Sequence, residues 1–524
     1  MTAEFEVVIV GAGHNGLVAG TYLAKAGRRV LILERGPKLG GMTSSGFMIP
    51  EAPGHVVTPC AVELIFVRAT GLIEEFDLPR YGLRTVDPDP SYVYLHPDGN
   101  SIAVFRDPRR TAEDMARLSR ADGKAYLEFA KLLDALVDIG LPVMLNDPGR
   151  WKIGDLLKMI GALIRNRRLR DQLSALTAGT ADQIACEWFE HPASIALLTG
   201  IAAGAGPIDD DGNAAAYMIF GMLHRVGVGK PIGSMQSFSN ALGSAYAAAG
   251  GSLQLNSTVA EILIEDGKAR GVRLEDGSIV KARVVLATCD PRTAFQLATP
   301  TAIERRMRVR MEHAPAGRAN VVPFLANVAM SGPLRLRRHQ ERRTDGADLN
   351  KAVGLMGTPD EVRDSFAFAK RGEIPPRHAV SMTPLSNGDP TQAPPGQSLA
   401  YIYLPAAPVV ARGGWPAARD RVMESVLAQV GEFYEGFDRE IGRFVEAPPD
   451  RAARLNVTNG CVTHIDFASS RTGSKRPAYG MGGTAPVVPG FFLGGAGIHP
   501  GGGVSGLPGR ISASRVLRYL RSAR

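Results

Sequence analysis

Cysteine is scarce in this chain of 524 residues, and the few cysteines lie far apart. They are Cys60, Cys186, Cys289 and Cys461, and no two of them form a CxxC pair. Such scattered cysteines argue against a disulfide scaffold and against a zinc or redox site built on CxxC, and they fit a reducing compartment. We therefore expect a cytoplasmic protein.

Long hydrophobic runs are also missing. No uninterrupted apolar stretch reaches the roughly 18 residues that indicate a membrane-spanning helix. The opening residues, MTAEFEVVIVGAG, lack the basic start of a signal peptide. Hydrophobic residues make up 45% and charged residues 21% of the chain, which is the balance of a soluble globular protein.

Three further absences argue against a metal site, a nucleic-acid partner and a serine hydrolase. None of the ten histidines has HxxxH or HExxH spacing, so the sequence predicts no metal site. The net charge is +8, but the basic clusters are short and have no aromatic residues between them, so we expect no nucleic-acid partner. Ser505 lies in GVSG rather than in the GxSxG turn of a serine hydrolase.

What the sequence does contain begins with a glycine motif between a predicted strand and a predicted helix. The β-branched stretch FEVVIV, residues 5–10, precedes GAGHNG, which places Gly11, Gly13 and Gly16 at GxGxxG spacing. Gly11 permits the turn, Gly13 lets a pyrophosphate approach the backbone, and Gly16 lets the helix pack on the sheet. A second predicted strand ends at Glu34, whose carboxylate can bind an adenosine ribose. The pattern predicts a dinucleotide site, the alternative being a glycine-rich turn of another α/β protein.

A second glycine pair, Gly40 and Gly41, follows in the stretch RGPKLGGMTSS. A plain NAD domain does not need this loop, whereas a flavoprotein can use it along the ribityl chain and the pyrophosphate. The extended pattern resembles the GR2-type flavoproteins, which include amine oxidases and carotenoid desaturases. The resemblance implies FAD as the cofactor, and an α/β fold in which a GR2-type FAD-binding Rossmann-like domain is interleaved with an α+β substrate domain.

Later stretches narrow the resemblance. Residues 230–259 and the stretch CDPRTAF, residues 289–295, are similar to segments of phytoene desaturase-like enzymes. The ending FFLGGAGIHPGGGVSGLPGR, residues 491–510, is the most specific match. It is closest to the subgroup that includes the pyridine nucleotide-disulphide oxidoreductase domain-containing protein 2, with carotenoid desaturases and retinol saturase as relatives. One departure is Ser234, which stands where that pattern usually has the second glycine of Gly-Gly-Met.

The resemblance also implies positions for the cofactor contacts. Val259 would contact the adenine through its backbone, and a helix from about Val504 would direct its N-terminal dipole at the flavin ring. His499 is the candidate catalytic residue, as a polar group beside the flavin, and a role in stabilising the turn is the alternative. The predicted cofactor-binding residues are Gly11, Gly13, His14, Asn15, Gly16, Glu34, Arg35, Gly40, Gly41, Met42, Thr43, Val259, Gly495, Ala496, Gly502, Gly503 and Val504.

The cofactor motifs divide the chain into two discontinuous domains. The predicted FAD-binding domain consists of residues 1–80, 231–298 and 481–524. The predicted substrate-binding domain consists of residues 81–230 and 299–480, which carry no cofactor motif. In this second domain the apolar residues Trp188, Phe189, Met218, Phe220 and Met222 are candidates for a substrate lining, although such stripes are more often plain core.

Residues 151–173, WKIGDLLKMIGALIRNRRLRDQL, read as an amphipathic helix with basic residues at Arg165, Arg167, Arg168 and Arg170. One interpretation is a peripheral membrane contact, in which apolar residues enter the lipid surface and arginines meet anionic head groups. The other interpretation, which we favour from the sequence alone, is a surface helix with a solvated basic face.

These observations predict an FAD-dependent oxidoreductase that moves a hydride between the flavin and a carbon of a lipophilic substrate. The leading example is desaturation of an isoprenoid or polyene-like compound at a CH–CH bond. A flavin can accept a hydride from an activated C–H bond with little acid–base help. Amine oxidation, and a saturase or isomerase that uses reduced FAD, remain alternatives within the same fold. A flavin-binding protein without activity is the reading that the intact cofactor motifs favour least.

Overall fold

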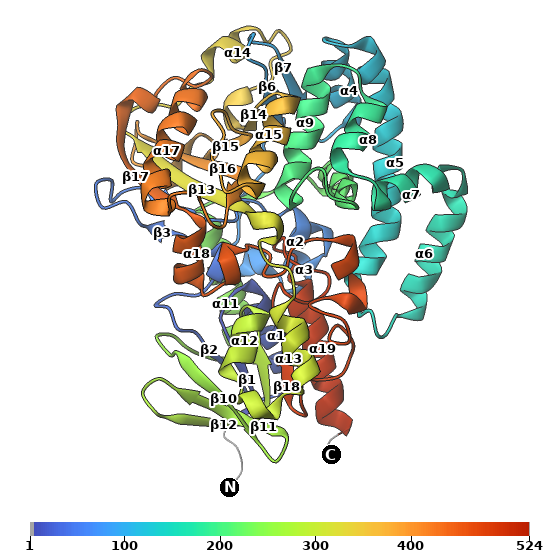
Figure 1. Ribbon diagram of the computed structural model, residues 1–524, viewed down its shortest axis with the longest axis vertical. Coiled ribbons are helices and arrows are strands. Elements are labelled where there is room, and N and C mark those ends of the chain that lie inside the picture. Colours follow the sequence, from blue (N-terminus) through green and yellow to red (C-terminus); the bar gives the residue numbers. More distant parts are fainter. Residues whose placement is uncertain (1–4, 523–524) are drawn as a thin grey trace.

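The structure is a computed structural model that describes residues 5–522. Figure 1 shows two lobes, each built on one large sheet, with the chain crossing between them several times. The outermost residues of two predicted FAD-domain pieces, 1–4 and 523–524, lie outside the described residues. No helix within residues 5–522 has the length and apolar character needed to cross a membrane.

The first sheet has a parallel centre and an antiparallel edge. Its strand order is β10-β11-β12-β1-β2-β9, and β18 pairs with β12 beside β1. The pairs β1–β12, β1–β2, β2–β9 and β12–β18 are parallel, whereas β10–β11 and β11–β12 are antiparallel. The strands are β1 (Phe5–Val10), β2 (Val30–Leu33), β9 (Ser252–Gln254), β10 (Val259–Glu265), β11 (Lys268–Leu274), β12 (Ile279–Ala287) and β18 (Phe491–Leu493).

Both faces of this sheet are covered, as expected for a parallel sheet. Val7 and Ile9 of β1 pack with α1 (His14–Lys25), α11 (Met235–Ala248) and α19 (Leu507–Ser522). Val8 and Val10 point to the other face, where α12 (Pro291–Leu297) and α13 (Arg305–Glu312) add apolar side chains. The alternation follows from the two-residue repeat of a strand. It explains why the predicted strand, residues 5–10, is apolar almost throughout.

The second sheet has the order β17-β13-β16-β15-β14-β6-β7. Its pairs are antiparallel except for β14 and β6, which run parallel. The strands are β6 (Tyr92–Leu95), β7 (Ser101–Val104), β13 (Val321–Met330), β14 (Val353–Met356), β15 (Val380–Pro384), β16 (Ser398–Pro408) and β17 (Glu440–Glu446). Two short ribbons complete the strands, β3 (Gly46–Phe47) with β4 (Val56–Val57) and β5 (Thr85–Val86) with β8 (Lys230–Pro231).

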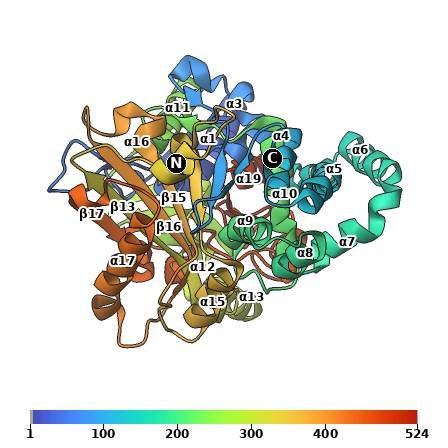
Figure 2. The ribbon, with the colours of Figure 1, turned by 90° about the horizontal axis from the view of Figure 1, so that it is seen from above.

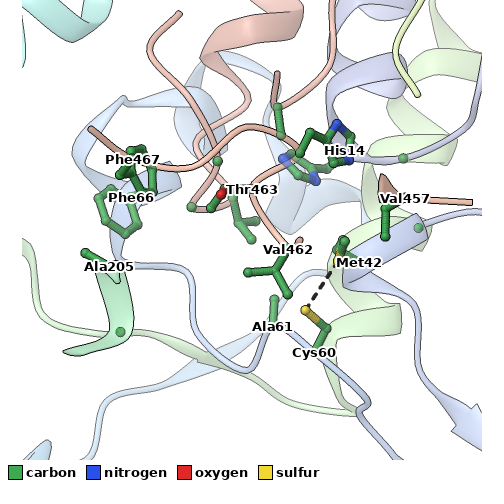
Figure 3. A pocket seen from close by; sticks show the side chains of 18 of the residues that line it. His14, Met42, Cys60, Ala61, Phe66, Ala205, Val457, Val462, Thr463 and Phe467 are labelled. Atoms are coloured by element: carbon green, nitrogen blue, oxygen red, sulfur yellow. Dashed lines mark hydrogen bonds between the residues drawn. The ribbon is translucent and has the colours of Figure 1, made fainter. Parts of the chain in front are cut away.

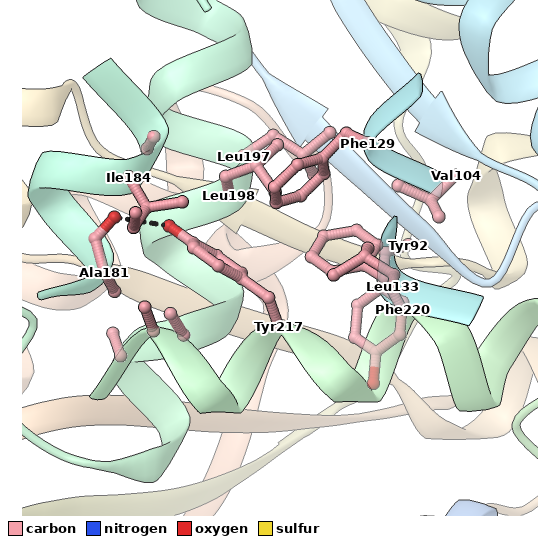
Figure 4. Close-up of a cluster of buried hydrophobic side chains, with 14 of the residues drawn as sticks. Tyr92, Val104, Phe129, Leu133, Ala181, Ile184, Leu197, Leu198, Tyr217 and Phe220 are labelled. Carbon is pink, nitrogen blue, oxygen red and sulfur yellow. Dashed lines mark hydrogen bonds between the residues drawn. The ribbon is translucent and has the colours of Figure 1, made fainter. Parts of the chain in front are cut away.

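A group of helices covers one face of the second sheet, and Figure 4 shows the apolar cluster that joins them to it. There the Tyr217 ring meets Phe129 edge-on and Phe220 at a tilt, with ring centroids 5.7 and 6.4 Å apart. The helices of this group are α4 (Pro108–Ala116), α5 (Arg120–Leu145), α8 (Ala181–Trp188), α9 (Pro192–Ala202), α10 (Met218–Val226) and α15 (Pro359–Lys370). On the opposite face lies α17 (Trp415–Gly431), which packs through Trp415 and Val426.

The remaining helices lie between or beside the lobes. They are α2 (Ile65–Ala69), α3 (Leu72–Glu75), α6 (Ile153–Arg165), α7 (Arg170–Ala178), α14 (Arg337–Glu341), α16 (Leu385–Gly388) and α18 (Pro448–Leu455). Viewed from above in Figure 2, α6 and α7 stand at the margin of the molecule, beyond α5.

The strands of the two sheets fall into the segments that the predicted domains contain. The packing crosses those segments, however, because Ile303, Met311 and Ile465 belong to the apolar cluster around Val8 and Val285 of the first sheet. Parts of residues 299–314 and 461–481 therefore pack with the cofactor-side core, and the domain boundaries at 298 and 480 stay predictions.

The predicted amphipathic helix over residues 151–173 is divided. Helix α6 ends at Arg165, a single turn follows at Arg167–Leu169, and α7 begins at Arg170. At the break, the Asn166 side-chain amide donates to the Ala162 carbonyl oxygen at 2.9 Å. Asparagine side chains that bond nearby backbone in this way compete with helix continuation.

Candidate active site

The turn between β1 and α1 is built for a close ligand. Gly11 has a φ of 102°, which a residue with a side chain rarely adopts. A Cβ on Gly16 would lie 2.1 Å from the Gly11 carbonyl oxygen, so only glycine lets α1 start there. Gly13 is the N-cap residue of α1 and has no side-chain cap. The free N–H groups and the positive end of the helix dipole therefore face the cavity that Gly13, His14 and Asn15 line.

Glu34 stands at the carboxyl end of β2, as the sequence predicts. Its Oε2 accepts a hydrogen bond from the Ala12 N–H at 2.8 Å, and its Oε1 accepts one from the Gly36 N–H at 2.9 Å. These bonds fix the carboxylate against the glycine turn, and each oxygen keeps a second lone pair for a ligand. Arg35 and Val259 line the same part of the cavity.

The second glycine loop packs against the first. The Gly40 N–H donates to the Ala12 carbonyl oxygen at 2.9 Å, and Gly40 has a φ of 123°. Thr43 is fully buried, and its hydroxyl lies 2.7 Å from that of Ser239. This hydrogen bond anchors the loop on the side that faces away from the cavity. Gly41 and Met42 line the cavity, whereas Gly40 and Thr43 support them.

The C-terminal glycine stretch forms the opposite wall. Ala496, Gly502, Gly503 and Val504 line the cavity, whereas Gly495 packs beneath it, where a Cβ would lie 2.2 Å from the Thr288 carbonyl oxygen. Val504 has a φ of 52°, an unusual conformation for a β-branched residue and a sign of stored strain.

Because of this backbone, the last helix begins later than the sequence predicted. Gly503 and Gly506 have φ values of 101° and 69°, which a right-handed helix excludes. The helix α19 therefore starts at Leu507 rather than near Val504. The first N–H of α19 is held by the Ser505 hydroxyl, which accepts from Leu507 N at 3.3 Å.

His499 lies behind the cavity wall, and its predicted catalytic role stays a prediction. Its ring is 4% exposed and is not part of the cavity wall, and Nε2 lies 3.0 Å from the Val143 carbonyl oxygen. Burial lowers the pKa of His499 to about 4, so the ring is neutral near pH 7 and its Nε2–H donates to Val143. This geometry corresponds to the turn-stabilising alternative, in which His499 ties the C-terminal loop to the end of α5. The neighbouring Pro500 lines the cavity in its place.

The walls described above enclose one cavity of about 1480 Å³ between the two lobes. This volume exceeds the roughly 300–1,000 Å³ of a usual small-molecule pocket, so it has room for a dinucleotide and a second molecule. Figure 3 shows His14 and Met42 on one side, Phe66 and Phe467 on the other, and Val462 and Thr463 between them. Among residues 5–522, no group of three or more His, Cys, Asp or Glu side chains is arranged to hold a metal ion.

The cavity has two chemically different sides. The glycine side is formed by the motifs described above, from Gly11 to Met42 and from Ala496 to Val504. The apolar side is lined mainly by aliphatic side chains of α5, α9 and α10, namely Leu136, Ile139, Val143, Ile201, Met218, Ile219 and Met222. Of the predicted lining candidates, Met218 and Met222 reach the cavity, whereas Trp188, Phe189 and Phe220 belong to the helical core.

One polar pair, formed by the buried Tyr92 and the half-buried Glu63, lies at the wall of the cavity and was missed by sequence reasoning. The Tyr92 hydroxyl donates to Glu63 Oε2 at 2.6 Å, and Glu63 Oε1 has no hydrogen-bond partner among the described residues. Burial raises the pKa of Glu63, although the Lys230 charge and the Tyr92 hydrogen bond oppose the shift. Phe66 lies one turn beyond Glu63, and a Cβ on Gly503 would be 3.1 Å from its ring. The pair therefore lies close to the C-terminal glycine wall.

Two neutral histidines were also not foreseen as a pair. Burial and the nearby His464 lower the pKa of His14 to about 4, and burial also lowers the pKa of His464. Both rings line the cavity, where His464 adopts a φ of 63°. Residues 14 and 464 are far apart in sequence, and no spacing rule connects them.

The comparisons with known proteins agree with this geometry. The family model described as flavin-containing amine oxidoreductase matches residues 16–516. The chain belongs to this family. FAD is therefore its cofactor, and the uncapped start of α1, the glycine cradles and the Glu34 carboxylate fit that molecule.

Individual proteins also align along nearly the whole chain. A mouse pyridine nucleotide-disulfide oxidoreductase domain-containing protein 2 is 27% identical over 556 residues, covering 99% of this chain and 94% of the relative. A neurosporene-forming phytoene desaturase of Rhodobacter capsulatus is 24% identical and covers 96% and 91%. A triple mutant of putrescine oxidase shares the fold, with a TM-score of 0.62, 16% identity and coverage of 98% and 99%.

The family assignment confirms the predicted resemblance, the α/β fold class with its FAD-binding and substrate parts, and the predicted cofactor. The chain is thereby an FAD-dependent oxidoreductase of the amine oxidase and phytoene desaturase family. The contacts of individual residues with FAD stay predictions, and the structure brings most of them to one cavity.

Proposed function

We propose that this oxidoreductase removes a hydride from a carbon of a lipophilic, isoprenoid or polyene-like substrate and introduces a carbon–carbon double bond. The observation that carries the proposal is the apolar side of the cavity, which continues from the glycine wall between α5, α9 and α10. A long hydrocarbon fits such a lining because it gains about 25 cal/mol for each Å² of apolar surface removed from water. The likeness to a phytoene desaturase supports the same substrate class.

Desaturation of a CH–CH bond removes a hydride from one carbon and a proton from the next. When bound, FAD supplies the acceptor for the hydride. The proton needs a base at the wall, and the Glu63 carboxylate is the best placed. Among the other carboxylates of the cavity, Asp290 accepts from the Arg292 and Thr458 N–H groups and Asp210 pairs with Arg318. Asp211 and Glu275 are exposed to solvent, whereas Glu63 lies beside the apolar lining.

The Glu63 environment is suited to hold that proton. Its raised pKa makes the carboxylate a stronger base than an exposed glutamate. The Tyr92 hydroxyl keeps the carboxylate in place, and the apolar lining excludes water from the reacting carbons. After proton transfer, the neutral acid is the form that burial favours.

Amine oxidation is the second candidate function. It is favoured by two aromatic rings beside the C-terminal glycines and by the nearby Glu63 carboxylate. Phe66 and Phe467 lie against the C-terminal glycines, where Cβ atoms on Gly503 and Gly501 would be 3.1 and 2.7 Å from their rings. Aromatic rings and a carboxylate such as Glu63 can together hold an alkylammonium group. The fold shared with putrescine oxidase is compatible with this reading and does not select it.

The absorption spectrum of the FAD-loaded protein tests the choice. Under anaerobic conditions, we expect phytoene in lipid vesicles to bleach the flavin band and putrescine to leave it unchanged. Bleaching by putrescine alone would replace the proposal by amine oxidation. Oxidation of the dithionite-reduced protein by an alkene, without bleaching of the oxidised form, would instead indicate a saturase.

A further inference from the structure

The helix α6 presents an apolar face to solvent instead of to the protein. Ile153 is 77% exposed, Leu157 is 62% exposed and Ile164 is 60% exposed. Together with Leu156, Ile160 and Leu163, which are also exposed, they recur every three or four residues and form one stripe along the helix. Ala162 is the buried residue of α6, and it lies on the opposite side of the helix from this stripe.

The position of α6 leaves this stripe accessible. Figures 1 and 2 both show α6 at the edge of the molecule, separated from the two sheets by α5. The helix is tied to α5 by polar contacts on its inner side. Arg165 pairs with Asp138 at 3.1 Å, and the Asn146 amide donates to Asp155 at 3.1 Å. The outward direction of the stripe is thus part of the fold.

Basic side chains lie at the two ends of the stripe. Lys152 is exposed just before α6, and Arg167, Arg168 and Arg170 are exposed on the turn into α7 and at its first residue. An apolar stripe of this size marks an interaction surface, because soluble proteins rarely expose so many large aliphatic side chains together. Apolar residues next to a cluster of lysine and arginine match a bilayer surface that carries anionic lipids.

A second copy of the chain fits this surface less well. A symmetric contact through α6 would place the same patch of each subunit against the other. In an antiparallel pair, the arginines after α6 of one copy would lie near Lys152 at the start of α6 of the other, and these like charges repel. An anionic lipid surface has the complementary charge.

The surface lies beside the apolar side of the cavity. The carboxyl-terminal half of α5 serves both, because Ile139 and Val143 line the cavity while Asp138 and Asn146 hold α6. On α7, Thr177 also lines the cavity and is exposed. The helix α6 is therefore separated from the cavity lining by α5.

We propose that α6 and the arginines at its end form a lipid-binding surface, which seats the protein on an anionic bilayer with the apolar stripe of α6 in the head-group boundary. The lipophilic substrate then enters the apolar side of the cavity from that layer. The second statement rests on the proposed function, whereas binding to lipid does not.

Vesicle sedimentation of the FAD-loaded full chain tests the surface. We expect binding to vesicles of 70% phosphatidylcholine and 30% phosphatidylglycerol, and at least tenfold weaker binding to phosphatidylcholine alone. The variant Leu157→Glu/Ile160→Glu/Ile164→Glu should lose at least tenfold in affinity, and Arg167→Gln/Arg168→Gln/Arg170→Gln should lose the preference for the anionic lipid. The matched control Ile279→Glu/Val410→Glu changes exposed aliphatic residues elsewhere and should bind like the unchanged protein.

Trp151 provides an internal probe, since it is one of three tryptophans and lies two residues before α6. Brominated lipids in the anionic vesicles should quench its fluorescence, and Trp151→Phe should remove the quenched component while leaving sedimentation intact. Trp415 is buried in the second lobe and should be unaffected.

Several results would overturn the proposal. One is absence of binding to the anionic vesicles, and another is binding that the α6 variant does not weaken. A dimer in solution that the α6 variant dissociates would assign the stripe to a second copy. The outcomes are separable from the proposed function, because sedimentation needs no turnover. If the protein binds the vesicles but phytoene does not bleach the flavin, the lipid-binding surface would stand and the proposed desaturation would be rejected.

Discussion

The glycine side and the apolar side of the cavity are built in opposite ways. On the glycine side, backbone atoms approach the ligand, and residues 11–16 supply the turn, the helix start and the space in one short stretch. On the apolar side, the contacts are side chains from three helices that are distant in sequence. A cofactor that is bound by backbone atoms therefore requires a motif of neighbouring residues. An apolar lining requires only large aliphatic residues on helices that the fold brings together.

The largest expected effect comes from filling the space on the glycine side. Gly13→Val should abolish FAD retention, because the new side chain would occupy the position of the pyrophosphate. The fold should tolerate the change, since a Cβ at Gly13 has no neighbour closer than the Gly40 carbonyl oxygen at 4.0 Å. The measurement is the flavin absorbance after purification and gel filtration, with the circular dichroism spectrum as the folding control. Normal retention would show that the phosphate lies elsewhere.

The second-largest expected effect comes from the Glu63–Tyr92 pair, which lies between the glycine side and the apolar side of the cavity. Glu63→Gln preserves the shape and the acceptor for Tyr92 but removes the base, so the rate of anaerobic flavin reduction should fall about 10²–10⁴-fold. In the unchanged protein the rate should decrease as the pH falls through the raised pKa of Glu63, because the protonated acid cannot accept a proton. The substitution should abolish this acidic limb.

Tyr92→Phe is the matched control, because it removes the hydrogen bond and leaves the carboxylate. We expect a smaller loss of rate and an acidic limb that persists. A Glu63→Gln protein with an unchanged rate and pH profile would exclude Glu63 as the base and leave desaturation to another group.

A buried ion pair connects the two sides, and breaking it should reduce stability. Asp147 follows α5 and accepts hydrogen bonds from Arg515 of α19 at 2.8 and 3.1 Å and from Arg518 at 2.9 Å. Asp147→Asn leaves Arg515 buried without its counter-charge, which costs about 3–5 kcal/mol in comparable pairs. The urea midpoint should fall accordingly. The exposed Lys131–Glu128 pair is the control, and Glu128→Gln should not move the midpoint measurably.

The smallest expected effect is a loss of folding stability at acidic pH, to which one buried histidine in each lobe contributes. Burial lowers the pKa of His499 beside the cavity and of His378 in the second lobe, each to about 4 from the ordinary 6.5. The unfolded chain then binds more protons between these two pH values. The stability from the neutral rings is complete above pH 6.5 and is lost progressively as the pH falls towards 4.

Urea unfolding at pH 7.5 and pH 5 measures this loss. His499→Gln and His378→Gln should each make the difference between the two midpoints smaller. If His499 instead acts beside the flavin, His499→Gln would abolish flavin bleaching while leaving the acid loss unchanged, and the position assigned to the ring here would be wrong.

Local rules predicted the glycine side well. The predicted strand at residues 5–10 coincides with β1, and Glu34 stands at the end of the second predicted strand, directly after β2. These features depend on residues that are close in sequence. The late start of α19 was missed because a run of glycines does not reveal which of them adopt positive φ.

Non-local pairing accounts for what the sequence did not show. The Glu63–Tyr92 pair joins a segment before α2 to the strand β6, and neither residue belongs to a motif. The proximity of His14 and His464 likewise depends on the packing of the C-terminal region against α1. For His499, the glycine context suggested the flavin, but the direction of its ring is decided by the Val143 carbonyl oxygen.

The sequence by itself determined the family, the cofactor and the amphipathic character of residues 153–165. Glycine spacing and the helical repeat are patterns of residues that are close together in the sequence. Only the tertiary structure decided which side of α6 meets solvent, which carboxylates line the cavity and which apolar residues line it. Those outcomes depend on the packing of segments hundreds of residues apart, and burial and pairing there set both the accessible surface and the protonation of each group.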